Sequence, residues 1–443
     1  MNANPETAGA MKRSLIPIVF FLCLFGVVLG EPASAEPVKN VILYLAPGLG
    51  PHQYRLLEGI VRESGKDLAL AKFDRRLKMT TGILGADRPD REGAGSTLAT
   101  GWLCPPGLLS VTADGLPLPT VLERAQLAGR SIGLITLGDL TQGALTPFAV
   151  HGSSDLDLEQ RARQLFDGRV QVLIGRDREV FQNAHDGDGR PLLERMVEEG
   201  YTLAESDRRK FLTAKGTHLI AFFDHVFRVD QRFYPMEPGL AQILIKSLSI
   251  LRQNPKGFFL VVEAAGLDLA CRMNDPAGLA NELLELDEAV EAGINFAGLN
   301  PETLVVVAPP YEAGNFFLVE DQLPHFIEQY QTIQCSPVYL DQQIGGNNDA
   351  THVLKQFLEV MGVNFLERSE MRDMVSLKPG PQRVQRIASV VSHHVTGGYF
   401  AQSSPSARSV PLFVHGPGSD RWPPAVANHQ LAGLLARALD LPE

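Results

Sequence analysis

Two carboxylates and a guanidinium follow a short apolar segment at close spacing. The segment Phe258–Val262 is preceded by Gly257 and is too short for a helix, which is typical of a strand buried on both faces of a parallel sheet. Glu263 and Asp268 come directly after it, at the edge where open α/β sheets place their ligand chemistry. Arg272 follows Asp268 by four residues. We therefore expect a pocket at this end of the strand.

Further apolar runs alternate with amphipathic helical stretches along the chain. The first strand is expected at Val38–Leu45, and the glycine-containing turn Ala46–Gly50 follows it. This alternation indicates an α/β fold with a doubly wound, mostly parallel sheet and helices on both faces. The other expected strands are Ile132–Thr136, Val170–Ile174, His218–Phe223, Thr303–Val307, Ala388–Val391 and Val410–Val414, and the expected helices include Leu118–Leu127, Leu192–Glu199, Leu240–Arg252, Leu279–Ala289 and Val353–Met361.

Length and composition exclude several classes of protein. The 443 residues are 44% hydrophobic, which is enough for the core of one large α/β domain or two smaller ones. A net charge of −11 argues against binding to nucleic acid or to an anionic membrane. The cysteines form neither a zinc ribbon nor a redox motif, and both one disulfide and none are compatible with their number. They are Cys23, Cys104, Cys271 and Cys335.

The N-terminal residues are typical of a secretory signal peptide. Lys12 and Arg13 precede an apolar run at Leu15–Leu29, and Ala33-Ser34-Ala35 offers the small residues of a cleavage site. An uncleaved membrane anchor is the alternative, but the apolar run is short against the roughly 20 residues that span a bilayer. We predict export, with residues 1–35 removed before Glu36 and the mature protein in the periplasm or outside the cell. Either Met1 or Met11 could be the start.

Four motifs in the same order resemble the alkaline phosphatase family. Lys39–Gly50 is similar to its opening strand and turn, and Asp90–Gly101 to its nucleophile segment. Gly257–Gly278, with the helix ending Leu-Asp-Glu-Ala-Val after it, and Val410–Gly418 are similar to two further landmarks. The resemblance covers nearly all of residues 37–443. It implies the family's three-layer α/β sandwich, with a peripheral insertion at about 319–349 in this chain.

The resemblance also implies an active site whose central residues are replaced here. Members of the family use two zinc ions to activate a Ser or Thr nucleophile, and a magnesium ion supports them. At the matching positions this chain has Pro47 for a metal-bridging Asp, Arg91 for the nucleophile and Leu137 for a magnesium-binding Thr. Asp155 falls near the position of an Arg that clamps phosphate. A guanidinium is permanently protonated and cannot act as the nucleophile.

Two metal-ligand positions of the family are retained. Glu263 matches a magnesium ligand and Asp268 a zinc ligand. The other ligand positions carry no imidazole and no carboxylate: they hold Arg272, Pro310, Tyr311 and Pro405. Because zinc needs three or four donors, two carboxylates do not make such a site.

The replacements suggest a hypothesis about charge. If the fold is kept, two guanidinium groups lie in one pocket with the retained carboxylates and can supply the positive charge of the missing metals. We expect this arginine–carboxylate cluster to stand in for the metal centre. Its expected members are Asp90, Arg91, Glu263, Asp268 and Arg272.

Two functions from different classes remain open at this point. The first is a catalytically inactive family member with a binding or structural role, without metal cofactors, whose pocket binds a small anion such as phosphate. The alternative is an active metal-dependent phosphomonoesterase with zinc, magnesium and a rearranged site. Its candidate nucleophiles are Ser96 and Thr97, and its candidate donors include His393 and His394. The protein partner is unknown, and a homodimer rests on the resemblance alone.

Overall fold

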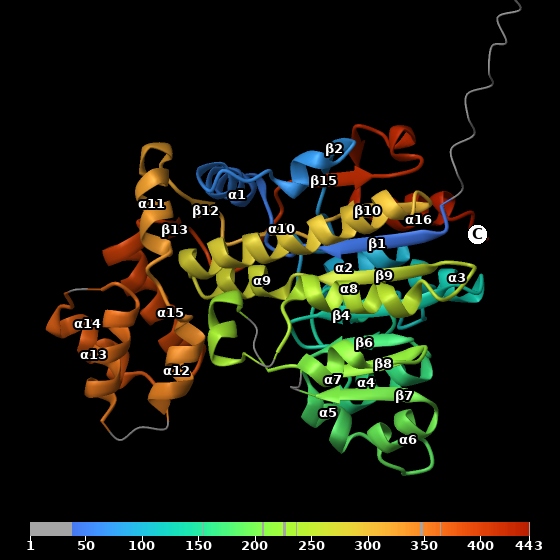
Figure 1. The fold of residues 1–443 in the computed structure, drawn as a ribbon, viewed down its shortest axis with the longest axis horizontal. Helices are drawn as coiled ribbons and strands as arrows, with labels where there is room; N and C mark the ends of the chain where they lie inside the picture. The colour runs from blue at the N-terminus through green and yellow to red at the C-terminus, as the bar shows by residue number, and fades with distance from the viewer. Residues whose placement is uncertain are drawn as a thin grey trace, which may run out of the picture. The chain divides into compact units, whose positions relative to one another are not determined.

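The computed structural model describes residues 38–153, 155–205, 208–224, 227–235, 237–345, 349–363 and 365–442 (Figure 1). The signal peptide expected at residues 1–35 lies outside the described residues. Among the helices of the described ranges, none has the length and apolar character needed to span a bilayer.

A ten-stranded sheet forms the centre of the fold. Its middle strand, β1 (Asn40–Leu45), pairs in parallel with β9 (Phe258–Glu263) on one side and β10 (Thr303–Val307) on the other. Of the ten strands, β15 (Val410–His415) runs antiparallel to both of its neighbours. The mostly parallel α/β sheet predicted from the sequence is thus confirmed. The other strands are β2 (Arg75–Met79), β4 (Ser131–Thr136), β6 (Val172–Gly175), β7 (Tyr201–Glu205), β8 (His218–Phe222) and β16 (Ala425–Val426).

Helices cover both faces of the sheet, because successive side chains of each strand point to opposite faces. In β1, Val41, Leu43 and Leu45 pack in one apolar layer, and Ile42 and Tyr44 pack in the other. The first layer contains α2 (Arg91–Thr100), α3 (Val121–Leu127), α4 (Leu158–Asp167), α5 (Arg178–Asn183), α6 (Leu192–Glu198) and α16 (Leu431–Ala438), and the second contains α1 (Pro51–Glu63), α7 (Arg208–Thr213), α8 (Leu240–Leu251), α9 (Ala265–Arg272) and α10 (Pro276–Leu299).

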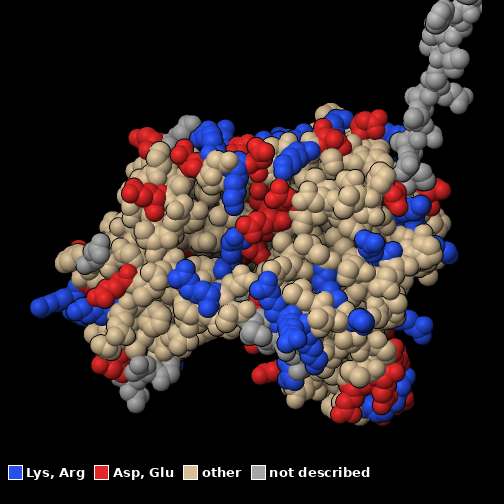
Figure 2. Space-filling model, in the orientation of Figure 1, with Lys and Arg blue, Asp and Glu red and all other residues tan. Residues whose placement is uncertain are grey.

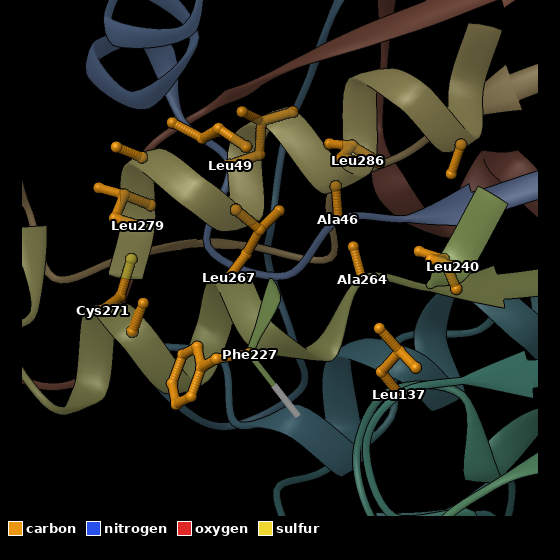
Figure 3. Close-up of a cluster of buried hydrophobic side chains, with 14 of the residues drawn as sticks. Ala46, Leu49, Leu137, Phe227, Leu240, Ala264, Leu267, Cys271, Leu279 and Leu286 are labelled. Atoms are coloured by element: carbon orange, nitrogen blue, oxygen red, sulfur yellow. The ribbon is translucent and has the colours of Figure 1, made fainter. Parts of the chain in front are cut away.

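The short helix α9 is anchored by its apolar side. Leu267 and Cys271, four residues apart, face Leu279 of α10 and the turn after β1 at Leu49 (Figure 3). This spacing places both side chains on one face of the helix. Asp268, one residue after Leu267, therefore projects in a different direction, toward the carboxyl ends of the strands.

The expected strands agree with the structure except at one place. Ala388–Val391 is the end of a helix, α15 (Pro381–Val391), and its prediction as a strand was wrong. Val384, Ile387, Ala388 and Val391 are all buried and repeat at helical spacing. The four-residue apolar run alone does not show this helical periodicity, because the residues that carry it precede the run. A single π-helical turn, Ser392–Thr396, follows and contains His393 and His394.

A helical segment lies between β10 and β15 at one end of the sheet (Figure 1). Residues 319–349, expected from the sequence to be a peripheral insertion, lie in the first part of this segment. Its base is a two-stranded pair of β12 (Phe316–Phe317) and β13 (Tyr399–Phe400), in which the first and last residues of the segment meet. Its helices are α11 (Leu323–Tyr330), α12 (Pro337–Gly345), α13 (Ala350–Val360), α14 (Arg368–Ser376) and α15.

The three cysteines of the described residues are buried and free, so Cys104, Cys271 and Cys335 form no disulfide with one another. The sequence allowed either one disulfide or none, and among these three cysteines there is none.

Candidate functional site

A pocket of about 160 Å³ lies at the carboxyl ends of four central strands. Pro47 follows β1, Asp139 follows β4, Arg176 follows β6, and Glu263 ends β9. This is the edge at which open α/β sheets bind their ligands. The pocket is lined by Pro47, Arg91, Gly138, Asp139, Gln142, Gly143, Arg176, Glu263, Ala265, Asp268, Leu269, Arg272 and Tyr311.

Glu263 is held by the loop after β4. One carboxylate oxygen accepts a hydrogen bond from the backbone N–H of Ala144 at 3.0 Å. The adjacent Gly143 has φ +100°, and a Cβ there would lie 3.1 Å from Glu263 Oε1, so the loop needs a glycine at this point. Burial raises the pKa of Glu263 to about 7, although the Ala144 N–H and the positive charge of Arg91 lower it.

Both carboxylate oxygens of Asp268 already have protein partners. Arg272 Nε donates to Oδ2 at 2.7 Å, and the Tyr311 hydroxyl donates to Oδ1 at 3.0 Å. The first contact follows from helix geometry, since residues four apart on α9 are neighbours. Asp268 is 3% exposed and Tyr311 is fully buried, and burial raises the pKa of the Tyr311 phenol well above its ordinary value. The phenol is therefore a neutral donor at ordinary pH.

Backbone contacts hold Tyr311 and Arg272 in place from outside the pocket. The carbonyl of Tyr311 accepts a hydrogen bond from the N–H of Gly48, in the turn after β1, at 2.9 Å. The carbonyl of Arg272 accepts one from Gln385 Nε2 of α15 at 2.8 Å. The helical segment thus supports the end of α9 that carries Arg272.

Arg91, the first residue of α2, is the pocket arginine without a partner. Across the described residues its guanidinium makes no hydrogen bond and no ion pair within 4 Å. Burial lowers the pKa of Arg91, but the negative charges of Glu92, Asp268 and Glu263 outweigh it, so the pKa lies above its ordinary value. Arg91 is thus a charged donor that faces the pocket.

Sequence reasoning missed a second ion pair on the opposite wall. Arg176 Nε lies 3.8 Å from Asp139 Oδ1, and Gln142 Nε2 donates to Asp139 at 3.4 Å. The backbone N–H of Arg176 bonds the carbonyl of Gly138 at 2.9 Å, which joins the ends of β6 and β4. Both charged residues follow the carboxyl end of a predicted strand, and that signal could have identified them.

Several residues expected in the pocket lie elsewhere. Asp90 caps α2: its carboxylate accepts from the N–H of Gly93 at 3.0 Å and of Gly107 at 2.8 Å, so it does not line the pocket. Leu137 belongs to the buried apolar cluster near Ala264 (Figure 3).

Three more of the expected residues are also outside the pocket lining. Asp155 is exposed in the loop after β5 (Gly152–Ser153), where it accepts a hydrogen bond from the Ser153 hydroxyl. Pro310 is buried beside Tyr311. Pro405 lies in β14 (Pro405–Ser406), which pairs with β11 (Glu312–Ala313).

The groups considered for a rearranged active site are also engaged elsewhere. Ser96 and Thr97 are fully buried in α2 and donate to the carbonyls of Leu108 and Gly93. His394 pairs with Glu370 at 3.0 Å in the helical segment. Neither His393 nor His394 is among the residues that line the pocket.

The donors around the pocket do not fit a zinc pair. Three carboxylates line it, those of Asp139, Glu263 and Asp268, but no imidazole or thiol does. Across the described residues no group of three or more His, Cys, Asp or Glu is arranged to hold a metal ion. Three guanidinium groups stand against the three carboxylates, which leaves no negative charge for a divalent cation.

The lining also limits the chemistry that the pocket can perform. It contains no Ser, Thr, Cys, His or Lys, and its single hydroxyl, that of Tyr311, donates to Asp268. A nucleophile with an adjacent base is therefore missing from the lining. What the pocket offers is a charged donor, Arg91, next to two ion pairs and the buried carboxyl group of Glu263.

Comparisons with known proteins agree with this architecture. The family model described as alkaline phosphatase matches residues 38–313. Alkaline phosphatase 4 of Bacillus subtilis is 23% identical over 457 aligned positions, which cover 97% of each chain, and alkaline phosphatase 3 of the same organism is 24% identical over 92% of this chain and 90% of its own. The crystal structure of Thermus thermophilus alkaline phosphatase superimposes with a TM-score of 0.84 at 22% identity, over 97% of this chain and 96% of that one. The alkaline phosphatase of a psychrophilic Shewanella has a TM-score of 0.78 at 19% identity, over 91% and 100%.

Proposed function

The chain belongs to the alkaline phosphatase family, and we propose that it is an exported member without phosphatase activity whose metal-free pocket binds a small oxyanion such as phosphate. The function is then recognition of the anion and not hydrolysis of its ester. The pocket volume of about 160 Å³ supports a ligand smaller than the drug-sized molecules that fill pockets of roughly 300–1,000 Å³.

The observation that carries the proposal is the pairing of Asp268. Its two oxygens would be the donors to a zinc ion, and Arg272 and Tyr311 occupy both. A buried carboxylate without its metal would be an uncompensated charge, and a guanidinium with a phenol compensates it. The arginine–carboxylate cluster expected from the sequence is therefore supported at Asp268 and Arg272, but not at Asp90.

The unpaired Arg91 supports anion binding. Arg272 and Arg176 have carboxylate partners, whereas Arg91 has none within 4 Å among the described residues. A guanidinium presents several N–H donors in a plane and matches the oxygens of a phosphate. The resemblance to the family's nucleophile segment places Arg91 where a group that attacks a phosphoester is expected, and a guanidinium at that place would hold an anion instead.

Export is supported by the sequence of the first 35 residues. The basic pair Lys12-Arg13, the apolar run Leu15–Leu29 and the small residues before Glu36 are the three parts of a secretory signal. N-terminal sequencing of the protein recovered from the periplasm or medium of an expressing bacterium tests this part. A mature chain that begins at Glu36 is expected, and an intact N-terminus in the cytoplasm would contradict it.

The relatives are named alkaline phosphatases, so hydrolysis of phosphomonoesters is the alternative function. It would need zinc and magnesium donors from outside the pocket lining, and no contact of the described residues favours it over anion binding.

Titration calorimetry with inorganic phosphate tests the anion-binding proposal. We expect one phosphate per chain, and we expect Arg91→Gln to weaken binding at least about tenfold, because a hydrogen bond to a charged group contributes about 1.5–3 kcal/mol. Arg55→Gln, which removes an exposed arginine of α1, is the matched control and should bind as the unaltered protein does. Absence of phosphate binding, or equal binding by the Arg91→Gln variant, would contradict the proposal.

A further inference from the structure

A second and larger cavity lies away from the pocket already described. It has a volume of about 720 Å³ and is bounded by α7, α8, α10, α11 and the 3-10 helix η3 (Arg228–Phe233). None of its lining residues is shared with the first pocket. Its size falls in the range of roughly 300–1,000 Å³ that suits an organic ligand.

The acidic wall of this cavity is hydrogen-bonded within the protein. Glu285 and Glu288 of α10 both accept hydrogen bonds from Arg228, at 2.8 Å and at 2.6 and 2.8 Å. Glu285 also accepts from the backbone N–H of Leu240, the first residue of α8. The two carboxylates and Arg228 therefore form a network with one net negative charge, and the two other lining arginines, Arg208 and Arg232, bring the lining to one net positive charge.

The basic wall, by contrast, has no carboxylate partners among the described residues. Arg208 of α7 makes no hydrogen bond or ion pair there, and its Nε is buried without a partner. Arg232 donates only to a neutral carboxamide, that of Gln334, at 3.2 Å. Figure 2 shows basic side chains gathered over α7 and acidic ones over α10 on the same face. A buried donor without an acceptor is costly, and among the described lining residues no carboxylate pairs with Arg208 or Arg232.

The cavity also has an unused acceptor. Gln242 of α8 lines it, and its carboxamide oxygen is buried without a hydrogen bond. A ligand of this cavity must accept from guanidinium groups, and it can donate to the Gln242 carboxamide when that side chain turns its oxygen toward the cavity. Inorganic phosphate is too small to do both across this volume.

We propose that this cavity binds a small organic anion, a polar molecule with hydroxyl or amino donors and a phosphate or carboxylate group that Arg208 and Arg232 hold. The other end of the ligand donates to Gln242. This site is separate from the oxyanion pocket of the proposed function and does not depend on it.

Titration calorimetry with the purified protein tests the proposal, using AMP and citrate as probes of the two anion chemistries and inorganic phosphate as the small-anion reference. We expect AMP or citrate to bind, and we expect Arg208→Gln and Arg232→Gln each to weaken that binding at least about tenfold. Arg55→Gln should leave it unchanged. Melting temperatures of all variants establish that each is folded.

The variants separate this site from the first pocket. If Arg91→Gln abolishes phosphate binding and leaves AMP or citrate binding intact, both sites are present. If neither probe binds, or if Arg91→Gln and not Arg208→Gln removes the binding, the second site is refuted while the first stands. A preference for AMP assigns a phosphate ligand, and a preference for citrate assigns a carboxylate.

Discussion

Asp268 is the residue at which a metal site and a metal-free site differ most directly. In a zinc site its oxygens would bind a cation, and here a guanidinium and a phenol donate to them at 2.7 and 3.0 Å. Each contact satisfies a buried acceptor that would otherwise lose its hydration without compensation. The guanidinium and the phenol therefore stabilise the fold at Asp268, and under the proposed function they take the place of a metal ion there.

Arg272→Gln should destabilise the protein by about 1–3 kcal/mol, because it leaves the buried Asp268 without its charged partner. Urea unfolding followed by circular dichroism measures this. Arg176→Gln is the control, since its contact with Asp139 is longer, at 3.8 Å, and more exposed, and it should cost less than about 0.5 kcal/mol. The double variant Asp268→Asn/Arg272→Gln should recover part of the loss. Equal effects of the two single variants would contradict the role given to Arg272.

Sequence reasoning treated Arg91 and Arg272 as equivalent, and the structure separates them. Arg272 shares a helix with Asp268 at a spacing of four, so their contact could be predicted from the sequence alone. Arg91 and Glu263 are brought near each other only by the packing of α2 against the loop after β4, which no local pattern encodes. That the guanidinium of Arg91 lacks a partner among the described residues is a property of the tertiary structure.

At the scale of elements, close packing of α2 fixes the pocket wall. Gly95 of α2 lies against the loop that holds Glu263, and a Cβ on it would stand 2.3 Å from the carbonyl oxygen of Ala144. The obstacle is backbone, which cannot rotate away. A helix interior otherwise disfavours glycine relative to alanine, so this residue is retained for the contact it allows.

Gly95→Ala should therefore destabilise the protein by about 1–3 kcal/mol through overpacking. Gly298→Ala is the matched control. Gly298 is exposed in α10, and no atom lies within 4 Å of the position that a Cβ would take there, so this substitution should stabilise by about 0.5–1 kcal/mol. Thermal unfolding of the two variants measures whether the change in stability is negative for Gly95→Ala and positive for Gly298→Ala. Stabilisation by both would mean that α2 is not packed as described.

His151 and Glu123 join the loop after β4 to α3 and should give a pH-dependent stability. The imidazole contacts Glu123 Oε1 at 2.8 Å and the carbonyl of Ser110 at 2.9 Å. Burial lowers the pKa of His151, but the hydrogen bonds to Glu123 and Ser110 raise it above its ordinary value of 6.5. The pKa of Glu123 is lowered from 4.5, because the bonds from His151 and the Thr120 backbone outweigh burial.

Because the pKa of His151 is raised in the folded protein, its protonation stabilises the fold fully below pH 6.5, and this stabilisation is lost as the pH rises through the folded-state pKa. Because the pKa of Glu123 is lowered, its ionisation stabilises the fold above pH 4.5, and this stabilisation is lost as the pH falls through the folded-state pKa. The pair should thus contribute most near pH 6. His151→Gln should cost about 1 kcal/mol there and clearly less at pH 9. Denaturant titrations at the two pH values measure this, and a cost independent of pH would contradict a charged pair.

Strands and helices were predicted correctly where the sequence shows only one hydrophobic pattern. Thr303–Val307 and Phe258–Val262 are continuous apolar runs with glycine or polar residues at their ends, and both are central strands. At Ala388–Val391 the short apolar run is typical of a buried strand, but together with the residues before it the run follows a helical repeat, and the structure has a helix there. Asp139 and Arg176 were missed because the motifs that resemble the family do not include them, although each follows a predicted strand.

At the scale of the whole molecule, the family's scaffold is kept, and the proposed function places the difference from the family in the pocket. The sheet and its two helical layers superimpose on an alkaline phosphatase over 97% of the chain. The core that specifies this fold consists of strand and helix residues such as Val41, Leu260 and Leu283, none of which lines the pocket. Pocket residues can therefore change without loss of the architecture, and the fold does not fix the function.

The measurement that tests the central claim most directly is metal content together with hydrolysis of p-nitrophenyl phosphate, made on protein exported in the presence of zinc and magnesium. We predict no stoichiometric metal, no turnover above that of the Arg91→Gln variant, and a melting temperature that EDTA leaves unchanged. Bound zinc at one or more ions per chain, with turnover that EDTA abolishes, would contradict the account and show that metal donors reach the site from outside the described pocket.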